Sequence, residues 1–302
     1  MKAVVLPEYG GPELLQVREV PEPKPGAGQI ELRVAAASLN PVDWKQRSGA
    51  IHKYFPVEFP AILGRDASGT VVHVGPGVTS LRVGDQVLGR PVSAHAEFAV
   101  GKAEDFAVIP PGLDLVEAGA LPLALLTGAQ LAEEAVNAQA GQKILVTGAL
   151  GSVGRVAVYT AKARGATVYA GVRKSQKPKA ADLGADAIVA LDDEDELTAL
   201  PELDAIADTV GGGVIQKLLD KVKSGGTIGS VLGKPEGAEA KGLKVNAIMT
   251  HGDPARLAAL ARAVAHGKLI IPIVARFPFS QAAAAHKLAE KGAGGKILLT
   301  PS

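Results

Sequence analysis

The chain has 302 residues, of which 47% are hydrophobic and 21% are charged, and its 32 lysines and arginines nearly balance its 31 aspartates and glutamates. This length is typical of two domains with separate hydrophobic cores. A formal net charge of +1, without any block of basic residues, argues against binding to nucleic acid or anionic lipid and favours a small neutral or cofactor-borne substrate.

The sequence contains no cysteine, which excludes disulfides, thiolate nucleophiles and cysteine-ligated zinc or iron–sulfur centres. The apolar run at residues 1–6 ends at Pro7, too soon for a signal peptide, and we interpret it as a first strand. No stretch approaches the ~20 apolar residues of a membrane span. We therefore expect a cytoplasmic protein.

Residues 1–121 are dense in proline and glycine, and short β-like runs such as 29–34 and 70–74 alternate with turn signals. This pattern predicts a compact, mostly-β domain. From about residue 122 strands alternate with helices, which predicts a parallel sheet with helices on both faces over residues 122–255. The expected helices are 124–136, 152–164, 179–184 and 214–223, and the expected strands are 143–147, 167–172, 187–191, 205–210 and 226–231.

The chain closes with an alanine-rich helix expected at 254–267 and short strands expected at 269–274 and 296–300. Because these strands are similar to those of the first domain, we expect residues 256–302 to fold back onto it. The doubly wound domain would then be an insertion. The acidic run at 192–196 is interpreted as a solvated loop between sheet elements.

Residues 143–154, KILVTGALGSVG, combine a β-branched run, three glycines at three-residue spacing and the start of a helix. A phosphate laid across such a turn meets free backbone N–H groups and the positive end of the helix dipole. The match to G-x-G-x-x-G is imperfect, since Ala149 stands at the first glycine, and a glycine-rich turn without a ligand is the alternative. The next expected strand completes a βαβ unit of ~30 residues and favours the dinucleotide interpretation. The candidate cofactor-binding residues here are Gly148, Ala149, Leu150, Gly151, Ser152, Val153 and Gly154.

Arg173 and Lys174 follow the strand expected at 167–172, about 20 residues past the glycine turn, where an NAD-preferring site places a carboxylate. No acid stands there to repel a 2′-phosphate, and two cations are available to pair with it. This pattern predicts NADPH as the cofactor, with Lys177 and Lys179 as further candidates. The alternative is that these cations only solvate a helix start.

Five further signatures accompany the glycine turn in order along the chain, namely SLNPVD at 38–43, LGRDASG at 63–69, VGDQV at 83–87, LPL at 121–123 and GKILL at 295–299. Together they resemble the medium-chain dehydrogenase/reductase superfamily, specifically its zinc-free, NADPH-dependent quinone oxidoreductase branch. The resemblance implies an α/β fold in which a Rossmann doubly wound parallel sheet is inserted into a GroES-like mostly-β domain. It also implies a cofactor cleft between the domains and a homodimer.

Zinc-dependent members of that family carry a cysteine near Asn40 and Gly-His-Glu where this chain has Gly64, Arg65 and Asp66. The zinc-binding residues are therefore missing, and we predict that the protein holds no metal. The six histidines lack ligand spacing and are interpreted as surface or strand residues; they are His52, His73, His95, His251, His266 and His286.

The resemblance also implies individual site residues. Asn40 is expected near the nicotinamide, and Thr127 near its ribose or carboxamide. Tyr54 is the nearest tyrosine for proton donation, although packing is the alternative for it and solvent is the alternative proton source. The residues expected along the cofactor are Thr209, Val210, Val231, Leu232, Gly233, Asn246 and Ala247, for which plain core packing is the alternative.

A site without a metal lacks the Lewis acid that alcohol dehydrogenation usually requires. Conjugated acceptors ease that requirement, because the charge that follows hydride addition delocalises onto oxygen. We therefore expect reduction of a quinone or an α,β-unsaturated carbonyl by NADPH, as the resemblance also implies. Two alternatives remain: a redox-sensing or scaffolding protein that binds NADPH with little turnover, and an enoyl-thioester reductase.

Overall fold

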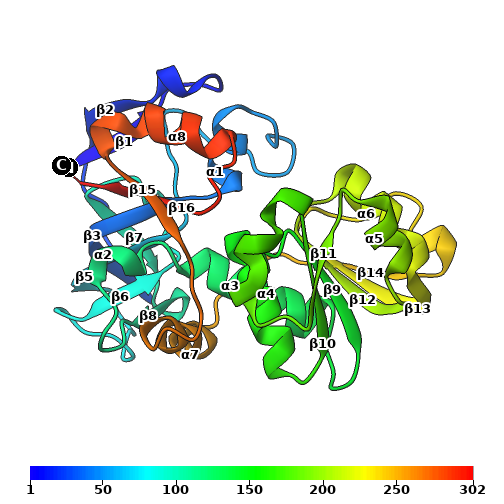
Figure 1. Ribbon diagram of the computed structural model, residues 1–302. Helices are drawn as coiled ribbons and strands as arrows, with labels where there is room; N and C mark the ends of the chain where they lie inside the picture. Colours follow the sequence, from blue (N-terminus) through cyan, green and yellow to red (C-terminus); the bar gives the residue numbers. More distant parts are fainter. Residues whose placement is uncertain (302) are drawn as a thin grey trace. The chain divides into compact units, whose positions relative to one another are not determined.

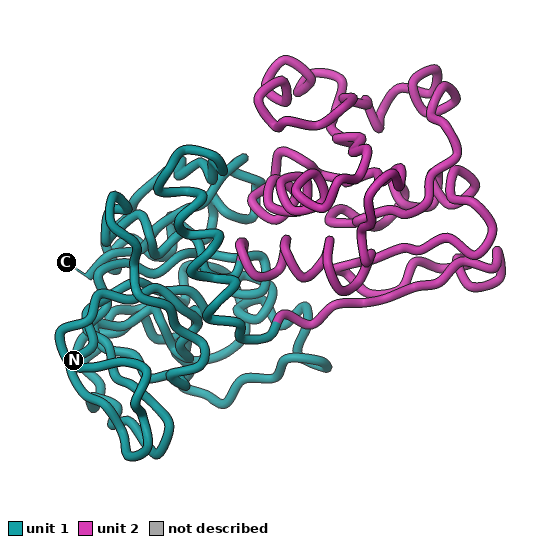
Figure 2. Tube along the Cα trace, turned by 90° about the horizontal axis from the view of Figure 1, so that it is seen from below, with its two compact units in different colours: residues 1–123, 251–302 teal, residues 124–250 magenta. Residues whose placement is uncertain are grey.

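The computed structural model describes residues 1–301, which divide into two compact units. Unit 1 comprises residues 1–123 together with the chain from His251 onward, and unit 2 comprises Ala124–Thr250 (Figure 2). Unit 2 is thus inserted into unit 1. Its ends lie close to the boundaries expected at 122 and 255, with residues 251–255 belonging to unit 1.

Unit 2 contains a six-stranded, wholly parallel sheet of strand order β11-β10-β9-β12-β13-β14 (Figure 1). The strands are β9 Lys143–Thr147, β10 Thr167–Val172, β11 Ala187–Ala190, β12 Leu203–Asp208, β13 Val222–Ser230 and β14 Lys244–Ala247. This order places the first strand, β9, beside the fourth, β12, as in doubly wound dinucleotide-binding sheets. The predicted fold class is confirmed.

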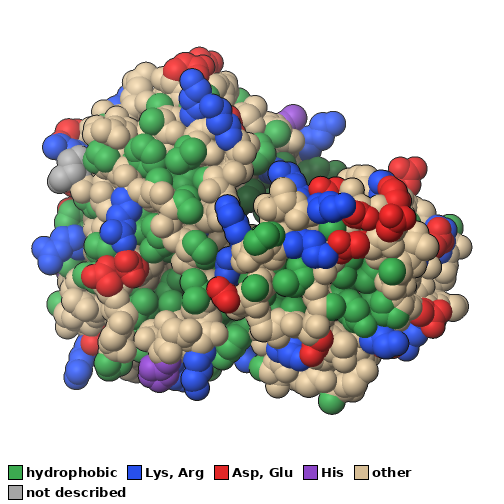
Figure 3. All heavy atoms as spheres, viewed as in Figure 1, with side chains coloured by type: hydrophobic (Ala, Val, Ile, Leu, Met, Phe, Trp, Pro, Cys, Tyr) green, Lys and Arg blue, Asp and Glu red, His purple; other side chains and the backbone are tan. Residues whose placement is uncertain are grey.

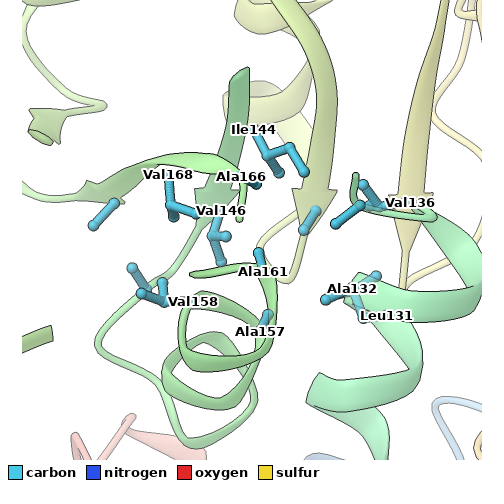
Figure 4. Packing of buried hydrophobic residues seen from close by; sticks show 14 of the residues in the cluster. Leu131, Ala132, Val136, Ile144, Val146, Ala157, Val158, Ala161, Ala166 and Val168 are labelled. Carbon is cyan, nitrogen blue, oxygen red and sulfur yellow. The ribbon is translucent and has the colours of Figure 1, made fainter. Parts of the chain in front are cut away.

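Helices cover both faces of this sheet. Successive side chains of β9 point to opposite sides and are apolar, so each face buries hydrophobic residues against helices. Ile144 and Val146 pack with Ala157 and Ala161 of α4 on one face (Figure 4), whereas Leu145 lies in the other core cluster. The helices of unit 2 are α3 Pro122–Gln130, which begins in unit 1, a π-helical turn Leu131–Ala135, α4 Ser152–Ala163, α5 Glu194–Ala199 and α6 Gly212–Leu218. A 3-10 segment, Lys174–Leu183, takes the place of the short helix expected at 179–184, and Pro178 within it disfavours a regular α-helix.

Unit 1 is mostly β, as predicted. Its larger sheet has the order β15-β16-β3-β5-β6-β8, with β7 also paired to β3, and a second sheet has the order β2-β1-β4. The strands are β1 Lys2–Leu6, β2 Gln16–Glu19, β3 Gln29–Leu39, β4 Ala61–Ile62, β5 Ala67–Val74, β6 Gln86–Gly89, β7 Phe98–Lys102, β8 Phe106–Val108, β15 Ile273–Pro278 and β16 Lys296–Thr300. The helices are α1 Pro41–Arg47, α2 Leu115–Ala118, α7 Pro254–Ala265 and α8 Ala282–Glu290.

Two expectations about local structure are wrong, and two elements were missed. The strand expected at 269–274 begins only at Ile273, because Pro272 has no N–H to donate to a ladder. The acidic run at 192–196 is no loop, since Asp193 caps helix α5 by accepting hydrogen bonds from the N–H groups of Asp195 and Glu196. Strand β14 and helix α8 were not expected at all.

The surface carries charges of both signs. Figure 3 shows lysine and arginine side chains interspersed with aspartate and glutamate on the face in view, in keeping with the near-balanced composition. Within residues 1–301, no helix combines the length and apolar character that a membrane span requires.

Candidate functional site

The glycine turn joins β9 to α4, and each glycine has a different role. Gly148 adopts a φ of +63°, and a Cβ on it would lie 2.5 Å from the Thr209 hydroxyl oxygen. A Cβ on Gly154 would lie 2.3 Å from the Gly148 carbonyl oxygen, so α4 reaches the turn only because residue 154 has no side chain. Gly151 is exposed and precedes α4; a Cβ there would meet only the Gly148 carbonyl, at 3.2 Å. The cradle that a pyrophosphate requires is therefore open at Gly151.

A buried carboxylate holds together the carboxyl ends of β9, β12 and β13. Asp208 Oδ1 accepts hydrogen bonds from the Thr147 hydroxyl at 2.8 Å and from the N–H groups of Val210 and Gly211. Its Oδ2 accepts from the Ser230 hydroxyl at 3.3 Å. These bonds fix the loops that follow the strands, at the edge where doubly wound sheets bind their ligands.

The expected cofactor residues of unit 2 lie after these strand ends or nearby. Val210 and Leu232 are 44% and 48% exposed, which leaves them free to contact a ligand. Gly233 has a φ of +97°. The Thr127 hydroxyl hydrogen-bonds that of Thr250 at 2.7 Å. Thr209, Val231, Ser152, Val153 and Leu150 are partly buried around the same edge, Ala149 is buried and Ala247 is exposed.

Asn246 differs from the others because its side chain already has a structural partner. Its amide donates to the Ala135 carbonyl at 2.7 Å, at the end of the π-helical turn. Sequence reasoning placed Asn246 along the cofactor without anticipating this bond.

The two cations after β10 are not equivalent. Arg173 is exposed, and its guanidinium has no hydrogen-bond or ion-pair partner within the described part of the chain. Lys174 instead forms an ion pair of 2.7 Å with Asp193, and the hydrogen bond between them raises the pKa of Lys174 and lowers that of Asp193. Lys177 is likewise paired, with Glu196 at 2.7 Å. Lys179 is exposed.

Unit 1 contains a buried polar cluster around Asp66, which has no exposed surface. Lys296 Nζ lies 3.3 Å from Asp66 Oδ2 and donates to Asn40 Oδ1 at 2.8 Å. Asn40 Nδ2 in turn donates to Asp66 Oδ2 at 3.0 Å. Because a lysine can only donate, its contact fixes which amide atom of Asn40 is the oxygen. One of the two Asn40 N–H donors is thereby used, and the other has no partner within residues 1–301.

Further donors complete this cluster. Ser38 and the Leu123 N–H also donate to Asp66, at 2.8 and 2.6 Å. Asp43 accepts a 2.7 Å hydrogen bond from the Asn40 N–H. Burial raises the pKa of Asp43 to about 7, although that hydrogen bond acts in the opposite direction. Tyr54, a candidate proton donor for which packing was the alternative, is 81% exposed and therefore takes part in no core packing.

Two models of protein families match the chain: the alcohol dehydrogenase GroES-like domain over residues 26–163 and the zinc-binding dehydrogenase over residues 183–299. An NADPH-dependent alkenal/one oxidoreductase of Arabidopsis thaliana chloroplasts is 31% identical over all of this chain and 80% of its own length. The chain belongs to the medium-chain dehydrogenase/reductase superfamily.

Two further similar proteins carry the name quinone oxidoreductase. A chloroplast envelope quinone oxidoreductase homolog of Arabidopsis thaliana is 38% identical over 63% of this chain, and the match spans 60% of that relative's length. The solved quinone oxidoreductase of Coxiella burnetii superposes with a TM-score of 0.90 at 29% identity, covering 100% of this chain and 99% of the other.

Histidine, aspartate and glutamate side chains are the candidate metal ligands of this chain. The chain has no cysteine, and no group of three or more histidine, aspartate or glutamate side chains among residues 1–301 is placed to hold a metal ion. His95 and His286, expected at the surface or in strands, are instead buried together with their rings 6.0 Å apart. Burial lowers the pKa of His95 to about 4 and that of His286 to about 2, so both are neutral at pH 7.

We expect that EDTA leaves the thermal unfolding midpoint and the activity unchanged, because no group of three or more histidine, aspartate or glutamate side chains in residues 1–301 is placed to hold a metal ion. Differential scanning calorimetry with and without the chelator measures the first quantity. Stoichiometric zinc found by elemental analysis of the purified protein would contradict this expectation.

Sequence reasoning proposed Asn40 as a site residue but missed the groups that hold its side chain. Asp66 and Lys296 occur in the LGRDASG and GKILL signatures, and one further signal was visible: Lys296 begins the strand KILLT, whose next three residues are apolar. A charged residue in such a run is expected to have a buried partner. The sequence does not show that this partner lies 230 residues away.

Proposed function

We propose that the chain is an NADPH-dependent reductase that transfers a hydride to a quinone or an α,β-unsaturated carbonyl without zinc. The observation that carries the proposal is the open turn at Gly151, at the start of α4, combined with the guanidinium of Arg173 after β10, which has no partner among residues 1–301. The first suits a pyrophosphate and the second suits a 2′-phosphate. The relative named as an NADPH-dependent alkenal/one oxidoreductase supports the same cofactor and acceptor class.

The chain's own residues would bind the cofactor as follows. The N–H groups at the start of α4 face a pyrophosphate, which the helix dipole also attracts. Val210 and Leu232 supply apolar surface beside it. Bound NADPH supplies the hydride, so the protein need not provide redox chemistry of its own.

Asn40 is the polar group that we assign to the substrate. Lys296 and Asp66 hold its amide at both ends, which leaves one N–H without a partner among residues 1–301. Such a pre-oriented donor stabilises charge that develops on a carbonyl oxygen during hydride addition. For a conjugated acceptor a hydrogen-bond donor is sufficient and no metal is required, because the charge that follows hydride addition is delocalised.

The direct test is steady-state oxidation of NADPH by the full chain with a panel of quinones and enones. Sustained turnover with at least one acceptor supports the proposal. Tight NADPH binding without turnover on any acceptor would instead favour a redox-sensing or scaffolding protein.

Cofactor preference provides a separate prediction. Changing Arg173 to alanine should raise the KM for NADPH by about 10-fold, the factor that corresponds to ~1.4 kcal/mol, because a charge-assisted contact to the 2′-phosphate is lost. The double change with Lys174→Ala should add little, since Lys174 is already held by Asp193. The KM for NADH should stay nearly constant. Equal losses for both cofactors would show that Arg173 is only a surface charge.

A further inference from the structure

Two neighbouring carboxylates hold Lys174 in place at the end of β10. Asp192 Oδ1 accepts a hydrogen bond from the Lys174 backbone N–H at 2.6 Å, and Asp193 Oδ2 accepts one from the ammonium at 2.7 Å. The other oxygen of Asp193, Oδ1, accepts from the N–H groups of Asp195 and Glu196 at 3.1 and 3.2 Å. Asp193 therefore caps α5 with one oxygen and holds Lys174 with the other.

The two side chains of this ion pair differ in how freely they can move. The Asp193 side chain is 16% exposed and is fixed by its capping bonds, whereas the Lys174 side chain is 69% exposed and lies on a flexible stem. Lys174 can thus leave Asp193, but Asp193 cannot follow it. Both groups are charged at neutral pH, since each shifts the pKa of the other toward the ionised form.

We propose that Asp193 is a specificity-determining residue that competes with the 2′-phosphate of NADPH for Lys174 and so weakens the preference for NADPH over NADH. The inference rests on the proposed function. NADH carries no 2′-phosphate and leaves the ion pair intact. NADPH must either draw Lys174 away from Asp193, which breaks the pair, or bind with Lys174 still neutralised. In both cases Asp193 reduces the gain from the phosphate, and Arg173 provides most of the discrimination.

The test is Asp193→Asn in the full chain, because asparagine caps a helix as well as aspartate does but carries no charge. Isothermal titration with NADPH and with NADH gives the two dissociation constants. We expect the dissociation constant of NADPH to fall about three- to fivefold, the range that an exposed ion pair can account for, and that of NADH to change less than about twofold. Glu194→Gln is the matched control: it removes an equal charge from the same helical turn, where Glu194 pairs with Lys217, which is no candidate for the 2′-phosphate, and it should not reproduce the effect.

The Lys174→Ala variant tests whether Asp193 affects NADPH binding through Lys174. If Asp193 acts through Lys174, Asp193→Asn should no longer change NADPH binding when position 174 is alanine. An effect that persists in that background, or that is equal for NADPH and NADH, would overturn the inference. If the wild-type protein binds NADPH and the Asp193→Asn variant binds it with the same dissociation constant, this inference alone would be overturned. Wild-type protein that binds no NADPH would overturn the proposed function and this inference together.

Discussion

Replacing Lys296 with methionine is expected to lower the free energy of unfolding by about 3–5 kcal/mol, the usual cost of removing one partner from a buried ion pair. Lys296 and Asp66 are 4% and 0% exposed, so the substitution leaves a buried carboxylate without its cation. It also leaves Asn40 Oδ1 without its donor. Urea denaturation of the full chain, followed by circular dichroism, measures the change.

Two controls separate the loss of charge pairing from a general packing defect. Adding Asp66→Asn to the Lys296→Met variant removes the stranded charge and should restore part of the lost stability. Lys223→Met breaks the exposed pair with Asp204 and should have a far smaller effect. Additive effects of Lys296→Met and Asp66→Asn would show that the two side chains do not stabilise each other.

Replacing Gly151 with valine is expected to weaken NADPH binding by at least about 100-fold, or ~2.8 kcal/mol, because a branched side chain fills the cradle beside the start of α4. The fold should survive, since Gly151 has a φ of −68° and its Cβ meets only the Gly148 carbonyl. Fluorescence titration with NADPH and a circular dichroism spectrum report the two properties. Unchanged NADPH binding by a folded variant would place the phosphate site elsewhere.

Gly154→Ala is the comparison for Gly151→Val, because it should destabilise the fold, whereas Gly151→Val should weaken only NADPH binding. Its Cβ would lie 2.3 Å from the Gly148 carbonyl oxygen and 2.8 Å from Ala149 Cα, both backbone atoms that cannot move aside easily. Overpacking of this kind costs about 1–3 kcal/mol or more. The two glycines thus separate the binding role of the turn from its structural role.

The sequence predicted the centre of unit 2 well because local signals there agree with each other. The strand at 143–147 and the glycine spacing that follows are confirmed by β9 and α4. Elements with weak local signals were missed: β14 has only four residues, and α8 begins in an alanine run, AAAA, without a side-chain cap. The start of α5 was mistaken for a loop, because a run of acidic residues is typical of a solvent-exposed loop. Acidic side chains are also favourable in the first turn of a helix, where they lie here.

The contacts of the candidate site were less predictable than its residues. Arg173 and Lys174 look equivalent in the sequence, and only the return of the chain at Asp193 distinguishes them. The same holds for Asn40, whose partners Asp66 and Lys296 lie 26 and 256 residues away. Spacing along the chain carries no information about such pairs, because they depend on which strands become neighbours.

The insertion of unit 2 has a consequence for the order of folding during synthesis. Strand β16 pairs with both β15 and β3 within the larger sheet of unit 1, with Ile297 opposite Leu39. All residues of unit 2 leave the ribosome before residues 296–300 do, so unit 2 can fold while β3 still has an unpaired edge. Asp66 likewise stays without its lysine until Lys296 emerges. We therefore expect a nascent chain that ends before residue 296 to hold a protease-resistant unit 2 beside an unfinished, aggregation-prone unit 1.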